Sequence, residues 1–378
     1  MRPDGTDRLA ALTELGFERV SLTPTAVESE RLGRRTVMTR AARPAMGTLV
    51  SLSIVSSSEG LAESGVNRAY EEMDRLIGTL SRFEPASPVG LLNTEGSLKN
   101  PPLELVHLIE DSLSYHELSR GAFDVSVKPL LDLFDDGNGR LSDSQPEARE
   151  WEEALAVVGS RHLHVDHREI RYGRSGMGIT LDGIAKGYIV DRMAERLFAA
   201  GLRNFLIDAG GDIRASGRGD GRPWRVAVQD PWKRGRYPEI IELSNAAVAT
   251  SGSYERYFDR DRRYHHVFSA LTGRSPSSSV SVSVVAPTAM AADALATTVF
   301  VLGPEEGVAL VDSLPGCSCL VVEPSGAMRG SRRWRGVIPS ELVGAGTEHG
   351  VPDARRRRAL KQVGIPILDS ALDSGEGS

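Results

Sequence analysis

Cysteine is nearly absent from this chain of 378 residues, which limits the metal sites and disulfide bonds that it can form. The two cysteines, Cys317 and Cys319, alternate in a strand-like stretch that places both thiols on one face. No nearby residue completes a zinc ligand set, so we interpret both as buried core cysteines. Two cysteines are also too few for a disulfide framework.

An excess of positive charge is also lacking. The chain has 45 Lys and Arg against 51 Asp and Glu, which gives a net charge of -6. Proteins that follow the phosphates of a nucleic acid need a concentrated basic face. We therefore expect no nucleic-acid partner, and any phosphate that the protein binds belongs to a small molecule.

Long apolar runs are missing from the amino-terminal part of the chain. Residues 1–36 carry Asp4, Asp7, Glu14 and Glu18 and contain no run of the kind found in a signal peptide or membrane anchor. We expect no direct membrane insertion and, for the chain as written, a cytoplasmic location.

The chain is long enough, and at 40% hydrophobic residues apolar enough, to bury a large core. Residues 1–36 are mostly polar with a weak helical pattern, which predicts an N-terminal arm that is partly helical or flexible. Residues 37–345 form the expected main domain. Residues 346–378 include an arginine run and predict a solvated C-terminal tail.

Helices and strands of several lengths follow one another in the main domain without regular alternation. The expected strands cover residues 49–55 and 204–207, and the expected helices cover residues 61–80, 103–119 and 188–200. This mixture predicts an α/β protein with mixed α+β sheets. No internal repeat is present.

A glycine-rich turn from Gly183 to Gly187 separates an expected strand from an expected helix. Backbone N–H groups at a helix start attract anions, and Lys186 adds a mobile positive charge. The turn matches neither the Walker pattern nor the dinucleotide fingerprint. A structural turn remains the alternative, as it does for the Gly210-Gly211 pair.

Asp293 and Thr297 are spaced i, i+4 in a stretch of helix-forming residues, so their oxygens share one face. A Mg²⁺ ion accepts a carboxylate and a hydroxyl together with water and phosphate oxygens. In the alternative interpretation, Thr297 bonds back to its own helix and Asp293 is satisfied locally.

His266 follows His265 and Tyr264 in a strand-like stretch. A histidine in this setting is usually a packed or hydrogen-bonded residue, but phosphoryl chemistry also uses such a residue to move a proton or to contact a phosphate. Strand alternation predicts that the two histidine rings face opposite sides, which argues against joint metal binding.

Several short motifs follow one another between residues 37 and 323. They are Arg43-Pro44-Ala45-Met46-Gly47-Thr48, Ser81-Arg82-Phe83, Gly121-Ala122-Phe123-Asp124, Asp182-Gly183-Ile184-Ala185-Lys186-Gly187-Tyr188, Gly210-Gly211-Asp212, Ala249-Thr250-Ser251-Gly252-Ser253-Tyr254-Glu255, His266, Thr272-Gly273 and Asp293-Ala294-Leu295-Ala296-Thr297. In their order and spacing they resemble the ApbE family, the FAD:protein FMN transferases.

The resemblance implies a two-lobed ApbE-like fold that holds FAD in the cleft between the lobes, with Mg²⁺ on the pyrophosphate. Asp293 and Thr297 would bind the metal through their side chains and Gly183 through its carbonyl, while Lys186 would approach the phosphates. The cofactor-binding residues that it implies are Met46, Gly47, Thr48, Asp182, Lys186, Gly210, Gly211, Thr250, Ser251, Gly252 and His266.

The reaction that the resemblance implies is a Mg²⁺-dependent phosphoryl transfer. A Thr or Ser hydroxyl in the flavinylation motif of an acceptor flavoprotein attacks the FMN phosphorus of FAD, and AMP leaves. His266, Lys186 and Asp293 are the implied catalytic residues, with alignment and charge neutralisation as the main effects.

Two acidic residues of the family pattern are replaced in this chain. Ser269 and Ala270 stand where the family has Asp-Pro, and Ser253 stands where it has Asp. Two alternatives therefore stay open: an FAD pyrophosphatase that gives FMN and AMP, and a non-catalytic FAD-binding protein. Many relatives are exported, so an extracytoplasmic location is the alternative if the true N-terminus differs.

Overall fold

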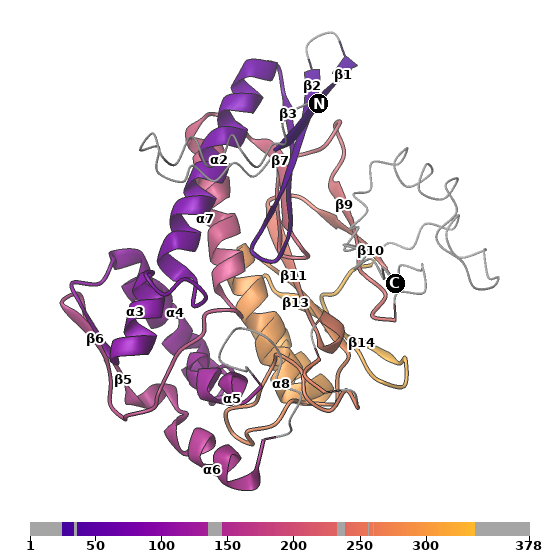
Figure 1. The fold of residues 1–378 in the computed structure, drawn as a ribbon. Helices are drawn as coiled ribbons and strands as arrows, with labels where there is room; N and C mark the ends of the chain where they lie inside the picture. Colours follow the sequence, from indigo (N-terminus) through magenta and orange to yellow (C-terminus); the bar gives the residue numbers. More distant parts are fainter. Residues whose placement is uncertain are drawn as a thin grey trace, which may run out of the picture.

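The protein is a mixed α/β structure built around one large antiparallel sheet (Figure 1). The computed structural model describes residues 25–33, 36–134, 146–232, 239–255, 257–259 and 261–336. The strands of the sheet, in spatial order, are β1 (Ala26–Gly33), β2 (Thr36–Ala45), β3 (Thr48–Ser56), β7 (Asn204–Ala209), β8 (Ile213–Ser216), β11 (Ala246–Gly252), β12 (Ser281–Ala286), β13 (Ser318–Val322) and β14 (Met328–Gly330). Every neighbouring pair is antiparallel.

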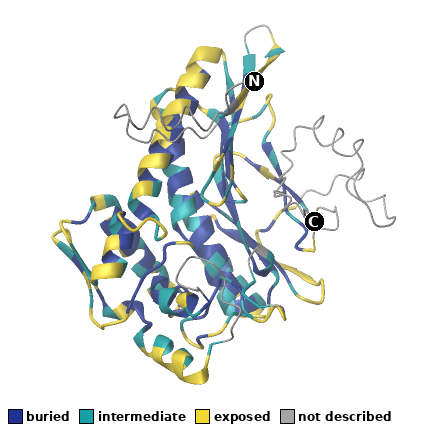
Figure 2. Ribbon diagram, viewed as in Figure 1, coloured by how far each residue is buried: buried dark blue, intermediate teal, exposed yellow. Residues whose placement is uncertain are grey.

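Three long helices cover one face of the sheet, and a β-hairpin covers the other (Figure 1). The helices are α2 (Glu59–Leu80), α7 (Ala185–Ala199) and α8 (Ala289–Ser313), and the hairpin strands are β9 (Trp224–Ala227) and β10 (Ile240–Leu243). Val50, Leu52 and Ile54 alternate along β3 and are fully buried in the core beneath the helices. In Figure 2 much of the central sheet and parts of the helices that cover it are dark blue, the colour of buried residues.

Smaller elements form a second lobe at the lower end of the helix layer (Figure 1). They are α3 (Pro88–Glu95), β4 (Ser97–Lys99), α4 (Leu103–Leu118), the 3-10 turn η1 (Val125–Val127), α5 (Lys128–Asp132), α6 (Ala148–Val157), the 3-10 turn η2 (Ser160–His162), β5 (Leu163–Val165) and β6 (Glu169–Tyr172). A third 3-10 turn, η3 (Ser253–Glu255), follows β11. Aromatic contacts of Phe134 with Phe258, Tyr264 and Phe268 join this lobe to the segment after η3. The second lobe is therefore joined to a segment that lies far from it in sequence.

Helix α8 is apolar over most of its length because it packs against the sheet. By length and composition alone it could cross a membrane, but 56% of its most apolar window is buried inside the protein. Gly303, with φ 82° and ψ 179°, breaks the helix in front of Pro304. Asp293 and Thr297, two of the three residues expected to bind the metal, lie in the half before this break.

The N-terminal boundary expected at residue 37 is wrong, because residues 26–33 belong to the sheet. Strand β1 pairs with β2 from Ala26↔Ala42 to Gly33↔Thr36. Glu28, Glu30 and Arg31 are exposed on this edge strand. An edge strand with little buried surface has no alternating apolar pattern, which is why the sequence indicated an arm. Residues 1–24 and the expected tail, 346–378, lie outside the described residues.

The expected helices correspond to α2, α4 and α7, and the expected strands to β3 and β7. Helix α7 begins at Ala185, three residues before its expected start. Its N-cap residue is Ile184, whose apolar side chain cannot accept a hydrogen bond. The local sequence therefore carries no start signal, and a more distant residue supplies the cap.

Candidate active site

The N-terminal half of α8 holds the two side chains expected to bind a metal. Asp293 is 4% exposed, and its Oδ2 accepts a hydrogen bond of 3.0 Å from the Gly187 N–H of α7. The Oγ1 of Thr297 lies 3.3 Å from Ser251 Oγ at the end of β11. The i, i+4 spacing thus places one oxygen at the start of α7 and the other at the edge of the sheet.

Gly183 lies directly against Thr297. An ideal Cβ at Gly183 would be 3.0 Å from Thr297 Oγ1 and 3.3 Å from its Cγ2, so a side chain at this position would displace the threonine. The structure therefore brings together all three expected metal ligands, Gly183, Asp293 and Thr297, from the turn before α7 and from α8.

Lys186 and Asp212 form an ion pair beside these ligands. The Lys186 Nζ lies 2.8 Å from Asp212 Oδ2, and the lysine side chain is 30% exposed while that of Asp212 is 2% exposed. The pair holds the lysine beside the Gly210-Gly211 turn, because Asp212 directly follows that turn. In this position the Lys186 ammonium group can bind an anion without breaking its ion pair with Asp212.

Asp208 is a fully buried carboxyl group at the end of β7, next to the same turn. Burial raises its pKa to about 7, and the negative charge of Asp212 raises it as well. The N–H of Gly211 donates a hydrogen bond of 3.0 Å to its Oδ1, which opposes this rise. Asp208 therefore changes its protonation state near neutral pH.

The Gly210 turn packs against the tight turn between β2 and β3. Met46 and Gly47 occupy that turn with φ values of 52° and 72°. Thr48 follows it, and an ideal Cβ at Gly210 would lie 2.3 Å from Thr48 Oγ1. Only glycine permits this approach, and as a result Met46, Gly47 and Thr48 border the same space as Gly210 and Gly211.

A small pocket opens next to these turns, between the sheet and the β9–β10 hairpin. It is lined by Gly210, Gly211, Ile213, Val226, Val228, Gln229, Ile241, Val248, Thr250 and Tyr254. Thr250 Oγ1 lies 2.8 Å from Ser283 Oγ, and the Tyr254 ring covers Gly252 so closely that an ideal Cβ there would be 2.3 Å from it. Its lining combines apolar side chains with glycine backbone and the hydroxyl groups of Thr250 and Tyr254, and the pocket is large enough to contact only a small part of a larger ligand.

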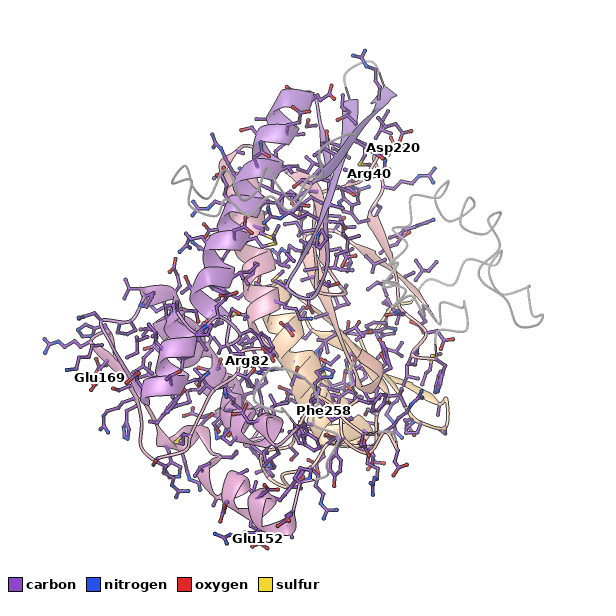
Figure 3. All side chains as sticks on the ribbon, in the orientation of Figure 1. Arg40, Arg82, Glu152, Glu169, Asp220 and Phe258 are labelled. Carbon is purple, nitrogen blue, oxygen red and sulfur yellow. The ribbon has the colours of Figure 1, made fainter. Side chains whose placement is uncertain are left out.

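Asp182, the residue before Gly183, is held by an arginine from the turn after α2. The Nε of Arg82 donates a hydrogen bond of 2.9 Å to Asp182 Oδ2, and its guanidinium lies 4.1 Å from the centre of the Phe83 ring. Figure 3 shows Arg82 between the two lobes. Arg82 was not among the expected site residues, although its motif, Ser81-Arg82-Phe83, carried part of the resemblance; its ion pair with Asp182 appears only in the structure.

His265 is a structural residue in this fold. Its Nε2 donates to the Pro276 carbonyl at 2.9 Å, and its Nδ1 accepts from the Val267 N–H at 3.3 Å. Burial lowers its pKa to about 4, so the ring is neutral. The ring also contacts Phe300, which lies about one helical turn after Thr297 in α8. The centroids of the two rings are 5.4 Å apart.

His266 starts a loop, and the strand expected around it is not formed. Among the described residues the segment forms a single isolated bridge, Tyr257↔His265, and the centroids of the two histidine rings are 6.2 Å apart. A backbone hydrogen bond from the Ser269 N–H to the Arg274 carbonyl closes the loop. The loop also packs against the second lobe, where Leu271 Cδ2 lies 3.4 Å from the ideal Cβ position of Gly121. His266 therefore lies on a loop, whereas the residues expected to bind the metal lie on and before helices.

The donor set fits a magnesium ion. Within the described residues no group of three His, Cys, Asp or Glu side chains could hold a metal. One carboxylate, one hydroxyl and one carbonyl are hard oxygen donors, and Mg²⁺ commonly takes few protein ligands and completes its shell with water and phosphate oxygens. Glycine at position 183 lets the backbone approach Thr297 closely, so that the Gly183 carbonyl and the Thr297 hydroxyl could serve the same ion.

Comparisons with known proteins agree with this geometry. The model of the ApbE family matches residues 46–321. An FAD:protein FMN transferase of Vibrio cholerae is 32% identical over 280 residues, which are 71% of this chain and 83% of the relative. One of Treponema pallidum is 32% identical over 311 residues, which are 76% and 84% of the two chains.

Solved structures give the same result for the fold. The flavin transferase ApbE from Vibrio cholerae superposes with a TM-score of 0.68 at 26% identity, over 82% of this chain and 96% of the other. The ApbE protein from Thermotoga maritima superposes with a TM-score of 0.67 at 31% identity, over 82% and 97%. The two-lobed ApbE-like fold expected from the sequence is confirmed.

Proposed function

The chain belongs to the ApbE family and transfers FMN from FAD to an acceptor protein, and we propose that it does so with Mg²⁺ held by Gly183, Asp293 and Thr297. FAD is the substrate. The observation that carries the metal proposal is the meeting of these three residues from two separate segments, with glycine required at the closest contact.

The reaction breaks one P–O bond and forms another. The oxygen of an acceptor Thr or Ser hydroxyl bonds to the phosphorus of the FMN part of FAD, and the bond from this phosphorus to the bridging oxygen breaks. AMP leaves with that oxygen, and the hydroxyl proton is lost. When bound, the metal ion neutralises charge that develops on the phosphate oxygens.

Lys186 binds and orients the phosphates in this proposal. Its ammonium group is already positioned by Asp212 at 2.8 Å, so little side-chain entropy is lost when an anion arrives. Asp293 holds the metal with one part of its carboxylate while Oδ2 accepts from the Gly187 N–H. His266 takes up the hydroxyl proton or contacts the phosphate.

The nucleotide lies along the two glycine turns and the end of β11. Thr250, Gly210 and Gly211 line the small pocket on the hairpin side of the sheet, whereas Ser251, the next residue of β11, lies 3.3 Å from Thr297 on the helix side. The turn of Met46, Gly47 and Thr48 borders the same space. Asp182 and Gly252 complete the expected binding residues, each at the edge of one of these segments.

The acceptor is a protein with a Thr- or Ser-containing flavinylation motif, which we propose binds where the second lobe faces the phosphates. The cytoplasmic location expected from the sequence stays a prediction, which fractionation of cells that produce the full chain tests. Nucleic-acid binding has no place in this proposal, given the net charge of -6.

One incubation tests the proposal. The purified protein is mixed with FAD and MgCl₂, with and without an acceptor fragment, and AMP, free FMN and the mass of the acceptor are followed. A flavin transferase releases AMP in step with a gain of one FMN on the acceptor, and EDTA stops the reaction. Free FMN without a change in the acceptor mass would instead show an FAD pyrophosphatase. Absence of AMP in both arms would leave a binding protein.

A further inference from the structure

The first turn of α8 carries hydrogen bonds that its own sequence does not supply. Asp191, from the middle of α7, accepts from Ala289 N–H at 2.9 Å and from Met290 N–H at 2.8 Å. Thr288, the N-cap residue, accepts from Ala291 N–H at 3.2 Å. All three N–H groups at the start of α8 are thus satisfied by side chains, two of them by the neighbouring helix.

The first turn of α7 is completed in the same way from the opposite direction. Its N-cap residue, Ile184, has no polar side chain, and the Gly187 N–H donates to Asp293 of α8 at 3.0 Å. Each helix therefore caps the other through an aspartate, of which Asp293 is buried and Asp191 partly buried. A negative charge at a helix start is also favourable because of the helix dipole.

The two helix starts are packed too tightly to slide. An ideal Cβ at Gly187 would lie 2.3 Å from the Ala289 carbonyl oxygen and 2.8 Å from Met290 Cα. Arg214 adds a second tie, because its Nε lies 3.8 Å from Asp191 Oδ1 and its Nη1 donates to the Pro287 carbonyl just before α8. The start of α8 is consequently fixed to both α7 and β8.

We propose that Asp191 is a positioning residue for the metal site, which sets the place of Asp293 and Thr297 by holding the start of α8 against α7. It touches neither metal nor substrate. The inference rests on the proposed function, since it assigns the metal to Asp293 and Thr297. It extends that function by making metal affinity depend on a carboxylate outside the site.

The reason lies in the spacing of the residues along the two helices. Asp293 is one turn after Ala289 and Met290, and Thr297 is one turn further on. If the first turn of α8 moves, both ligands move with it relative to Gly183, which stands before α7. A residue that orients a metal ligand usually contributes tenfold or more to the affinity for the metal. Loss of Asp191 should therefore weaken metal binding by a similar factor.

The test measures metal binding without turnover. Mn²⁺ is titrated into the full chain with FAD present and no acceptor, and the free ion is counted by electron paramagnetic resonance, with FAD alone as the blank. We expect Asp191→Asn to raise the Mn²⁺ dissociation constant about tenfold. Arg214→Gln, which removes only the secondary tie, should raise it by a smaller factor and serves as the milder variant if Asp191→Asn folds poorly.

Glu72→Gln is the matched control. Glu72 is 4% exposed and binds Arg75 and the α7 residue Arg196, so it also ties α7 to a neighbouring helix, but away from the start of α8. Its replacement should lower the unfolding temperature and leave Mn²⁺ binding unchanged. An equal loss of Mn²⁺ affinity in Glu72→Gln would show a general loss of stability and overturn the inference.

Asp293→Ala separates failure of the inference from failure of the proposed function. If Asp293→Ala loses Mn²⁺ while Asp191→Asn and Arg214→Gln bind it like the parent, the inference is wrong and the metal site stands. If the parent and Asp293→Ala bind Mn²⁺ equally, the assigned metal site is wrong and the inference falls with it.

Discussion

Two regions of the molecule meet at the site, and they are held in opposite ways. At the junction of α7 and α8, Asp191 and Asp293 each satisfy N–H groups of the other helix, and Gly187 lets the backbones touch. The loop after His266 is closed mainly by its own backbone, through the Ser269 N–H to Arg274 carbonyl bond of 2.9 Å. The junction is fixed by hydrogen bonds between two helices, whereas the loop combines its own backbone bonds with aromatic contacts to the second lobe.

The difference shows where variation is tolerated. The loop is also where this chain departs from the pattern of its family, with Ser269 and Ala270 in place of Asp-Pro. The backbone bonds that close this loop involve no residue of α7 or α8, so we expect its sequence to change without moving those helices. A change at the junction moves the metal ligands, so we expect substitutions there to affect function most.

Asp293→Ala should have the largest effect on the junction. It removes a metal ligand and the cap of α7, so we expect transfer to fall more than about 100-fold, above the range for outer partners of a metal, and stability to fall by about 1 kcal/mol. The rate of AMP release and urea unfolding measure the two effects.

Ser87→Ala is the control for Asp293→Ala, because Ser87 caps α3 by accepting from Gly90 N–H at 2.9 Å. It should cost a similar free energy of unfolding without loss of transfer. Normal transfer in Asp293→Ala would mean that the carboxylate is only a helix cap.

Gly187→Ala should come next. The new Cβ would lie 2.3 Å from a backbone oxygen, and backbone cannot move aside as a side chain can, so the free energy of unfolding should fall by about 1–3 kcal/mol. Gly78→Ala in α2 is matched, because nothing lies within 4 Å of its ideal Cβ, and this change should stabilise by about 0.5–1 kcal/mol. Equal stabilities of the two variants, measured in urea, would contradict the tight junction.

Asp208→Asn should change how stability depends on pH. The folded pKa of about 7 lies above the ordinary value of 3.8, so the folded protein keeps a proton that the unfolded chain has lost in this window. The contribution of Asp208 to stability therefore falls as pH rises from about 4 to about 7. Relative to Asp208→Asn, the parent should lose unfolding free energy over this range. Parallel curves for the two proteins would refute the shift.

Leu271→Ala, in the loop, should have the smallest effect. The side chain is 66% exposed, and surface substitutions of this kind stay within about 0.5 kcal/mol of the parent. Urea unfolding of the variant measures the change. A loss greater than about 1 kcal/mol would show that the loop is locked as firmly as the helix junction, and the comparison between the two regions would fail.

The sequence predicted those parts of the site that depend on regular spacing. Asp293 and Thr297 share a face because a helix repeats every 3.6 residues, and the order of the glycine motifs indicated the family. It did not reveal Asp191 or the start of α7 at Ala185, since those depend on hydrogen bonds between helices about one hundred residues apart. Strand β1 was missed because both faces of an edge strand are polar.

The His266 loop shows the other limit of sequence reasoning. Alternation of residues predicted a strand with the two histidines on opposite faces, but the segment forms a loop around a buried, neutral His265. Side chains in a loop follow no regular spacing that a sequence could show. The path of this loop depends on tertiary contacts such as those of His265 with Pro276 and Phe300. The role of His266 stays a prediction for this reason.

The central claim is that the metal binds at the junction of α7 and α8, and a crystal structure with Mn²⁺ and FAD tests it most directly. Anomalous diffraction locates manganese without reference to the surrounding density. We predict one strong peak within coordination distance of Asp293, Thr297 and the Gly183 carbonyl, next to the pyrophosphate. A peak elsewhere, with these three residues unchanged and in contact only with one another, would contradict the account.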